Sequence, residues 1–398
     1  DYTDNESAQI EPNAGLDARM TVLRSLTLDL TINPDFSQVE VDQQVTNLSR
    51  FSLFFPERRN FFLENNDLFG LFGFSQIRPF FSRQIGLFQG QTVPILGGAR
   101  LSGKINRNWR IGFMNMQTEG NGELGLRPQN YTVGAFQRRV GTRSNIAGIV
   151  VNRQGFEGTR PDGSDYNRLV GLDYNIFSKD NRFRGKLFYH HTFTPNVKNL
   201  NFAHASWLMY SDNNWQVMWN HEYVGANYRA DVGFVPRIEN FDPESETIDY
   251  RTYWRLEPEL TYTWYPKKWI IQAVSHSAYL SQYMSDAFNT TESRFNLRSE
   301  FVFRNQAYLG FGWVRQFTEL FYPFDVTGQQ LTPHPAGDYL YDLAGIWFES
   351  APAKRFTWSG SIEIGEYFTG TNNQVQADVG YRIQPFGSVR ISAQYNQI

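Results

Sequence analysis

Apolar and polar residues alternate along much of the chain, and the first long example runs from Leu16 to Ile32. Its even positions are mostly apolar, whereas its odd positions, such as Asp17, Arg19 and Asp29, are mostly polar. Alternation with a period of two is typical of a β-strand with one apolar and one polar face. The pattern predicts a strand far longer than the five or six residues usual in globular sheets.

The same alternation recurs along the rest of the chain and predicts roughly 17 strands in all. They cover residues 16–32, 93–105, 109–119, 130–140, 144–152, 166–177, 182–193, 201–211, 215–224, 250–265, 269–284, 292–304, 307–319, 338–349, 356–368, 374–384 and 389–398. Their apolar faces are rich in aromatic residues and Leu, while the opposite faces carry charged residues.

Short and longer connections between these strands take turns. Tight turns are predicted at 107–108, 141–143, 179–181, 212–214, 266–268, 305–306, 351–354 and 385–388, and longer polar connections at 119–129, 153–165, 225–249, 320–337 and 370–373. Outer-membrane barrels show this alternation of periplasmic turns and external loops. The predicted fold is therefore all-β: a transmembrane antiparallel up-and-down β-barrel of at least 16 strands, 18 or more when complete. It would occupy residues 16–398, after an N-terminal periplasmic lead-in at residues 1–15.

An odd number of strands conflicts with the even number found in bacterial barrels. Either one strand is miscounted, for which residues 229–235 are the candidate, or the sequence is part of a longer polypeptide that supplies a closing strand. Seventeen strands would place Ile398 on the outer face. No leader pattern follows Asp1, so we expect a signal peptide or a whole domain to have been removed.

Four Trp residues flank predicted short turns: Trp109, Trp215 and Trp269 follow one, and Trp264 precedes one. They would line up at one membrane interface, where an aromatic ring with a polar edge gains most. The alternative is a soluble β-sandwich or propeller. Against it, the chain has no fixed repeat of about 40 residues, and its strands are long for a sandwich. We expect the cell outer membrane as the location, with its lipid or lipopolysaccharide around the barrel.

Residues 33–92 break the pattern, and the part between Phe51 and Phe88 contains eleven Phe interleaved with Arg and Glu. A connection of about 60 residues this apolar would make a poor solvated loop. We therefore expect residues 33–92 to fold into the barrel as a plug, or to cap its mouth. The predicted network of plug and lumen charges comprises Glu57, Arg58, Arg59, Glu64, Arg78, Arg83, Arg255, Glu257, Glu259, Arg294, Arg298 and Glu300.

Two runs in this region, Thr31–Glu40 and Phe51–Asn65, resemble the signature of the family known as domain of unknown function 5916. That family consists of bacterial surface proteins that often carry an N-terminal module similar to family 9 carbohydrate-binding modules. The resemblance implies an outer-membrane barrel, and it implies glycan contact through a module that this sequence does not include. It implies no established activity.

Composition excludes several classes of protein. With 37 basic and 40 acidic residues and a net charge of −3, the chain lacks the basic excess of a nucleic-acid binder. It has no Cys, which excludes disulfides, Cys-ligated zinc and iron–sulfur clusters. No apolar run reaches the roughly 18 residues of a spanning helix. Aromatic residues make up 16%, and lipid-facing strands together with a Phe-rich plug would account for this share.

Catalytic and metal chemistry find little support in the sequence. His190 and His191 are adjacent on a predicted strand, so they point to opposite faces and cannot chelate one ion together. A serine hydrolase would need a Ser and a His on neighbouring strands, and no motif points to such a pair. Residues 161–165 fit an exposed polar turn better than a calcium site.

Glu257 and Glu259 lie on one strand face, as a carboxylate pair for glycoside cleavage would. Charged lumen residues are expected in any large barrel, however, and the neighbouring Arg255 favours a ladder of ion pairs. We predict no catalytic residue, no metal and no cofactor.

Four functions remain open. They are a plugged receptor or scaffold in an envelope complex, with envelope proteins or surface glycans as partners; a porin-like channel or gated transporter for small polar solutes; an envelope carbohydrate-active enzyme; and a soluble β-protein. The Phe-rich insertion favours the first, because it is large enough to block a barrel of this size.

Overall fold

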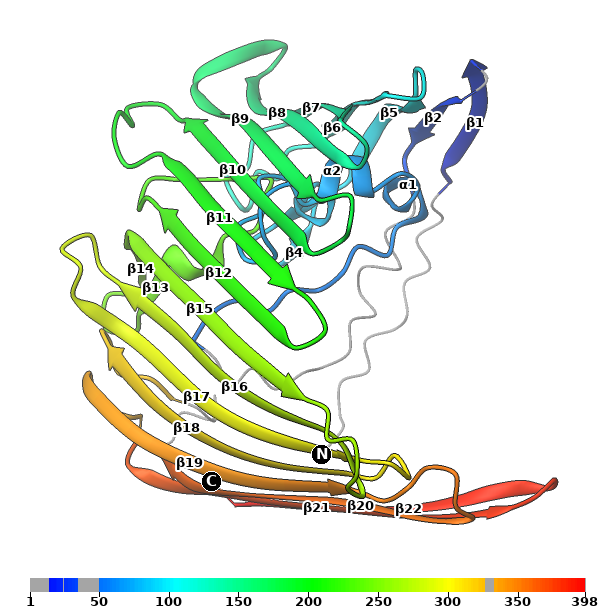
Figure 1. Cartoon of the computed structure of the whole chain (residues 1–398). Helices are drawn as coiled ribbons and strands as arrows, with labels where there is room; N and C mark the ends of the chain where they lie inside the picture. The colour runs from blue at the N-terminus through cyan, green and yellow to red at the C-terminus, as the bar shows by residue number, and fades with distance from the viewer. Residues whose placement is uncertain (1–13, 24, 35–49, 326–332, 398) are drawn as a thin grey trace, which may run out of the picture.

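The computed structural model describes residues 14–23, 25–34, 50–325 and 333–397. They form one strongly curved antiparallel sheet of 18 strands, with short helices and two small hairpins beside it (Figure 1). Among the described residues, no helix is long and apolar enough to cross a membrane.

Each strand of the large sheet pairs with its neighbours in chain order. The strands are β1 (Leu16–Leu23), β2 (Leu26–Ile32), β5 (Ile95–Lys104), β6 (Trp109–Thr118), β7 (Gln129–Val140), β8 (Ser144–Glu157), β9 (Arg160–Phe177), β10 (Phe183–Phe193), β11 (Phe202–Ser211), β12 (Trp215–Val224), β15 (Tyr253–Trp264), β16 (Ile271–Met284), β17 (Thr290–Phe303), β18 (Tyr308–Leu320), β19 (Gly337–Glu349), β20 (Phe356–Tyr367), β21 (Gly370–Ile383) and β22 (Gly387–Gln397). The other elements are α1 (Asn60–Leu63), α2 (Asp67–Gly70), η1 (Ser82–Gln84), η2 (Pro236–Ile238) and the hairpins β3 (Leu87–Phe88) with β4 (Gln91–Thr92) and β13 (Glu239–Asp242) with β14 (Thr247–Tyr250).

The predicted all-β, up-and-down antiparallel architecture is confirmed, and most predicted strands match observed ones to within a few residues. All predicted tight turns lie at one rim, which we call the turn rim. The connections 119–128 and 225–252 lie at the opposite rim, the loop rim, as do the described residues 321–325 and 333–336 of the connection between β18 and β19. Two predicted longer connections, 153–165 and 370–373, belong almost entirely to strands, because β8, β9 and β21 extend further than the sequence pattern indicated.

The prediction of a single strand at residues 16–32 is wrong, because β1 and β2 form a hairpin there. Leu16 pairs with Ile32, and Met20 pairs with Leu28. Paired side chains lie on the same face of a sheet, so even positions stay on one face on both sides of the turn. The hairpin changes the predicted 17 strands to 18, and the suspected residues 229–235 contribute no strand to the sheet.

The predicted barrel is not closed in this structure, because the first and last strands of the sheet do not pair with each other. Among the described residues, β1 pairs only with β2 and β22 pairs only with β21, so the sheet has two unpaired edges on its open side in Figure 1. β1 runs from the loop rim to the turn rim, while β22 runs the opposite way and ends at Gln397 on the loop rim. The predicted position of Ile398 lies outside the described residues.

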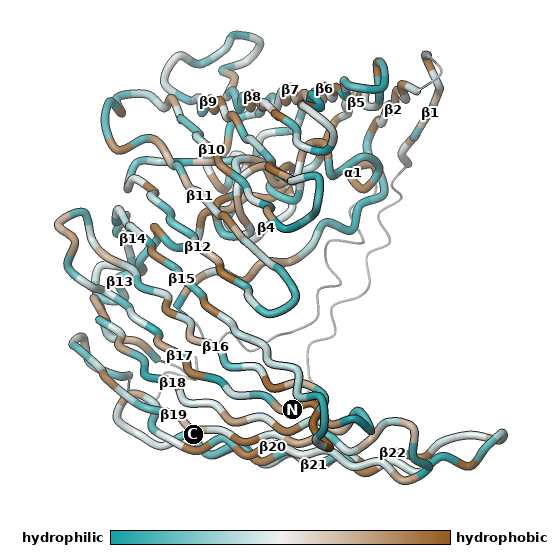
Figure 2. The backbone as a smooth tube through the Cα atoms, viewed as in Figure 1, coloured by the Kyte–Doolittle hydropathy of each residue, from teal (hydrophilic) through white to brown (hydrophobic). Residues whose placement is uncertain are grey.

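The two faces of the sheet differ in polarity, and Figure 2 shows the alternation along the strands. On the convex face, Leu260 and Trp264 of β15 are 46% and 49% exposed. On the concave face, Arg100, Asp173 and Glu222 are buried. A water-soluble protein normally has the reverse arrangement, and extended exposed apolar patches mark interaction surfaces.

The main core lies between the concave face of β5 to β12 and residues 50–92, which we call the insertion. Phe62, Leu68, Phe69 and Phe72 of the insertion are all buried. Phe69 and Leu68 pack on Gly112 of β6, where a Cβ atom would lie only 2.4 Å from the Phe69 ring. Small residues on the wall therefore make room for the aromatic residues of the insertion.

Candidate functional site

A buried ion pair lies inside the insertion. The side chains of Glu57 and Arg59 are 3% and 6% exposed, and Arg59 Nη2 donates to Glu57 Oε2 at 2.7 Å. The Ser82 hydroxyl donates to the same oxygen at 2.7 Å. Burial acts to raise the pKa of Glu57, but the hydrogen bonds and charge of Arg59, together with Ser82, outweigh it and hold the pKa below its usual value.

Arg59 connects separate parts of the insertion through the same guanidinium group. Its Nη1 donates to the carbonyl oxygen of Ile85, and its Nη2 donates to that of Ser82, each at 2.7 Å. The guanidinium also lies 4.3 Å from the ring centre of Phe62 in α1. One cation thus ties the start of the insertion to α1 and to η1.

A second polar cluster anchors the insertion to β9 and β10. Asp173 Oδ2 accepts a hydrogen bond from the backbone N–H of Gly73 at 2.9 Å, and Asp173 Oδ1 lies 2.7 Å from His190 Nε2. His190 Nδ1 contacts the hydroxyl of the buried Tyr228 at 3.2 Å. Gly73 has a φ of +65°, and a Cβ atom there would collide with a backbone oxygen. The positive φ and the close approach of the Ile77 carbonyl therefore require glycine at this position.

Further ion pairs join the insertion to other strands. Asp67 of α2 pairs with Arg110 of β6 at 2.6 Å, and the Arg110 hydrogen bond is the main reason why the pKa of Asp67 is lowered. Glu64 pairs with Arg19 of β1 at 2.5 Å. Arg50 pairs with Glu292 of β17. The insertion is therefore held by strands that lie far apart in the sheet.

Residues 225–238, which we call the cover segment, lie against the insertion. The backbone N–H of Phe81 donates to the carbonyl of Val232 at 2.6 Å. Arg78 and Phe234 exchange two backbone hydrogen bonds, of 3.0 and 2.9 Å. The insertion is thus enclosed between the cover segment and the wall of the sheet.

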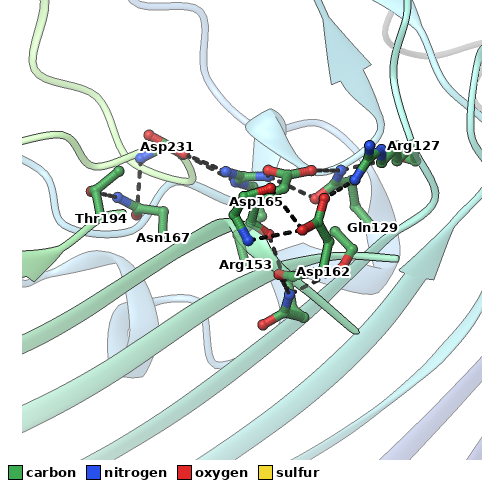
Figure 3. A network of polar contacts seen from close by, with 11 residues as sticks. Arg127, Gln129, Arg153, Asp162, Asp165, Asn167, Thr194 and Asp231 are labelled. Atoms are coloured by element: carbon green, nitrogen blue, oxygen red, sulfur yellow. Dashed lines mark hydrogen bonds and ion pairs between the residues drawn. The ribbon is translucent and has the colours of Figure 1, made fainter. Parts of the chain in front are cut away.

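A polar network fixes the cover segment to the wall at the loop rim. Figure 3 shows Arg153 of β8 between two carboxylates, Asp165 of β9 at 2.6 Å and Asp231 of the cover segment at 3.0 Å. Asn167 donates to the carbonyl of Arg229 at 2.7 Å. Asp165 pairs with Arg153, and Asp162 pairs with Arg127. Both carboxylates of residues 161–165 therefore take part in ion pairs with arginine.

The predicted plug charges Arg58, Arg78 and Arg83 lie within the insertion. Arg83 Nη1 donates to the carbonyl of Pro56 at 3.1 Å, and the guanidinium of Arg78 lies 4.3 Å from the ring centre of Phe54. The side chain of Arg58 is exposed. Both contacts join residues 54–56, near the start of the insertion, to residues 78–83 in its later part.

The predicted lumen charges lie together on the concave face of β15 to β17, and the ion pairs that we observe between them stay within the wall. Arg255 pairs with Glu257 at 2.6 Å and with Glu222 at 3.0 Å. Arg298 and Glu300 are 3.6 Å apart. Glu259 lies opposite Tyr279, and Arg294 lies opposite Ser281. In the described ranges, no three His, Asp or Glu side chains are grouped to hold a metal ion.

The four predicted interface Trp residues lie at the turn rim. Trp109 begins β6, Trp215 begins β12, Trp264 ends β15, and Trp269 stands in the turn before β16. Trp215, Trp264 and Trp269 are exposed.

A cavity of about 530 Å³ opens at the loop rim, between the start of the insertion and the ends of β15 to β18. Arg50 and Arg237 line it, and both pair with Glu292. Arg251 lies 3.9 Å from the ring centre of Phe321. The rest of the lining includes Phe51, Asp249, Tyr250, Tyr253, Tyr283, Asp286 and Glu319. Charged groups of both signs beside aromatic rings suit a small polar ligand.

No curated protein and no solved structure matches this chain. The family described as Domain of unknown function (DUF5916) matches residues 1–397. Because this match covers almost the entire sequence, the chain belongs to the DUF5916 family.

Proposed function

We propose that the large sheet is the wall of a β-barrel in the outer membrane and that the insertion is its plug. The protein would then act as a receptor or scaffold in an envelope complex, with envelope proteins or surface glycans as its partners. The observation that carries this proposal is the insertion itself, which is packed on the concave face by its Phe core and by ion pairs to β1, β6 and β17.

The convex face supports placement in lipid. A row of residues in register across four strands joins Val217, Leu260, Ala278 and Leu297. Val217, Leu260 and Leu297 are exposed. Lipid-facing strands of outer-membrane barrels have this apolar outer surface and a polar interior.

Closure of the sheet would follow from pairing of β1 with β22, since an even number of strands leaves these two edges antiparallel. In hydrocarbon an unpaired edge costs several kcal/mol for each unsatisfied backbone group, so the membrane favours closure. The chain has no Cys, which makes introduced cysteines unambiguous reporters.

Thr21→Cys on β1 is combined in turn with a cysteine at each of four positions on β22: Ser388, Arg390, Ser392 and Gln394. In membrane-inserted protein, we expect one of these four pairs to form a disulfide. All these side chains belong to the concave face, and a disulfide needs Cα atoms within about 7 Å. Thr21→Cys combined with Ile391→Cys, on the convex face, is the control and should stay reduced. Absence of any cross-link in the series would contradict closure by these two edges.

The plug is tested by removing it. β2 and β5 are direct neighbours, with Ile32 opposite Gly97, so a short Asn-Gly turn can replace residues 35–93 without breaking the sheet. We expect this variant to form stable channels in planar bilayers, while the intact chain stays closed. Shortening the exposed turn at 243–246 is the matched control and should open nothing. Equal conductance of the intact and deleted chains would refute a plug.

A porin-like channel is the second candidate, and one observation favours it. The insertion core packs on β5 to β12, whereas Arg298 on the concave face of β17 keeps 49% of its side chain exposed. Conductance of the intact chain, carried by small polar solutes, would support this alternative.

A further inference from the structure

A hydrogen-bonded row of one serine and two histidines lies on β11 and β12. Ser206 and His221 face each other across the two strands, and Ser206 Oγ lies 2.7 Å from His221 Nδ1. His221 Nε2 lies 3.2 Å from Nδ1 of His204, two residues before Ser206 on β11. A nucleophile within hydrogen-bond distance of a base, and a third group that orients the base, is the arrangement of nucleophilic catalysis.

One proton arrangement of this row satisfies both contacts and suits a nucleophile. Ser206 O–H donates to His221 Nδ1, and His221 Nε2–H donates to His204 Nδ1. The neutral His221 then has a lone pair directed at the serine hydroxyl, as a general base requires. His204 holds this tautomer in place, so it is a positioning residue.

Aromatic rings fix the two imidazoles. Tyr223 stacks on His204 with ring centres 5.3 Å apart and planes at 19°. Trp254 stacks on His221 at 6.2 Å and 27°. Such contacts restrict ring rotation, so the geometry of the row is held before any substrate arrives.

The row lies on the convex face among apolar side chains. Ser206 lies opposite Leu187 of β10, and the next residue on its face is Leu208, which lies opposite Trp219. Leu187, Leu208 and Trp219 are all exposed. Polar groups on a lipid-facing wall are costly, so a hydrogen-bonded Ser–His–His row there calls for a function.

We propose that Ser206, His221 and His204 form a hydrolytic site for carboxylic esters of long-chain acyl groups, such as those of membrane lipids. The proposal rests on the placement of the convex face against lipid, put forward above. The acyl chain would lie over Leu208 and Trp219, while the ester group reaches Ser206, the fifth of the ten residues of β11.

The reaction needs no partner other than the ester and water. Ser206 Oγ bonds to the ester carbonyl carbon, and its proton passes to His221 Nδ1. The bond from the carbonyl carbon to the alcohol oxygen breaks, and the alcohol takes up that proton. Water then attacks the acyl-serine and gives a proton to His221, which returns it to Ser206 Oγ as the acyl bond breaks. The products are one carboxylic acid and one alcohol.

A second Ser–His contact on the same face provides a matched control. His276 Nδ1 of β16 lies 2.9 Å from Ser299 Oγ of β17. Among the described residues, His276 has no hydrogen-bonded third group, so the orienting part of the arrangement is missing there. Ser299→Ala should therefore leave ester hydrolysis unchanged.

The test uses the full chain folded in detergent micelles, with its β-structure checked by circular dichroism. We expect a fluorophosphonate probe to modify Ser206, as located by mass spectrometry, and the protein to hydrolyse p-nitrophenyl palmitate and phosphatidylethanolamine. Ser206→Ala should abolish labelling. Ser206→Ala and His221→Phe should each lower kcat by a factor on the order of 100 or more. His204→Ala should lower kcat with KM unchanged, and His204→Asn, whose side-chain oxygen can still accept the hydrogen bond, should restore part of it.

Folded protein that is neither labelled at Ser206 nor active on either ester would overturn the proposal, as would equal activity of Ser206→Ala. Hydrolysis of p-nitrophenyl palmitate without hydrolysis of phosphatidylethanolamine would show that the site cleaves long-chain esters but not phospholipids. It would overturn the assignment of membrane lipids as substrates. Fractionation between membranes and soluble extract separates the two proposals. Labelled protein in the soluble fraction would refute the membrane placement only, and unlabelled protein in membranes would refute the hydrolytic site only.

Discussion

Glu57→Gln is expected to destabilise the insertion by about 3–5 kcal/mol, because it leaves the buried guanidinium of Arg59 without its counter-charge. The exchange keeps the size of the side chain, so packing in the Phe core stays as it is. The loss should appear as faster hydrogen–deuterium exchange of residues 57–85, by a factor of about 100 to 5000, because each 1.4 kcal/mol of lost stability raises the population of the open state about tenfold. The strands of the sheet should exchange as before.

Glu64→Gln is the matched control, because Glu64 lies in the same insertion and also forms an ion pair with an arginine, Arg19. The Arg19 side chain is 56% exposed, so water screens this pair and its loss should cost at most about 1 kcal/mol. Similar exchange rates for the two variants would show that the Glu57–Arg59 pair does not hold the insertion together.

Leu260→Arg is expected to impair membrane assembly by about 2–4 kcal/mol, the cost of an arginine that faces lipid near the middle of the bilayer. Leu260 stands within β15 with its side chain on the convex face. The measurement is the fraction of chain that folds into lipid vesicles at a series of urea concentrations, read as a shift in the unfolding midpoint.

Thr261→Arg places the same side chain one residue further along β15, on the concave face, where Thr261 Oγ1 lies 3.4 Å from Glu259. An arginine there can pair with this carboxylate, so we expect assembly close to that of the unchanged chain. Equal impairment by both substitutions would mean that the faces are assigned wrongly or that the sheet does not cross a membrane.

The strands could be predicted because their information is local. Period-two alternation marks the faces, and short Asn, Asp, Gly and Pro turns mark the ends, so most of the strands were found within a few residues. The hairpin at residues 16–32 escaped because Leu16 pairs with Ile32, both even-numbered, and the alternation passes through the turn unbroken. A turn that moved the apolar residues from even to odd positions would have been visible in the sequence. The odd strand count predicted from the sequence suggested either a missing closing strand or a miscount. The structure contains the additional strand in the β1–β2 hairpin, and the edges β1 and β22 are not paired with each other.

The site shows the same division between local and distant information. Glu57 and Arg59 stand two residues apart, and both belong to the predicted charge network. The anchor of Gly73 on Asp173 joins residues 100 positions apart, and no sequence pattern links them. The opposite orientation of His190 and His191 followed from strand geometry, and the structure buries His190 among the anchors. The Ser206–His221 contact depends on the register between β11 and β12, which alternation alone does not fix.

The anchors of the insertion also determine when it can be immobilised. The insertion follows β2 in the chain, yet it is held by Asp173 of β9 and by Glu292 of β17, which are 100 and 242 positions from their partners Gly73 and Arg50. Contacts between residues so distant in sequence form late, because the intervening chain must be ordered first. A sheet that grows from its N-terminal edge would thus carry a loose insertion until β17 is in place. Growth of the sheet and immobilisation of the insertion would then be separate events, and the insertion would become fixed after β17 has joined the sheet.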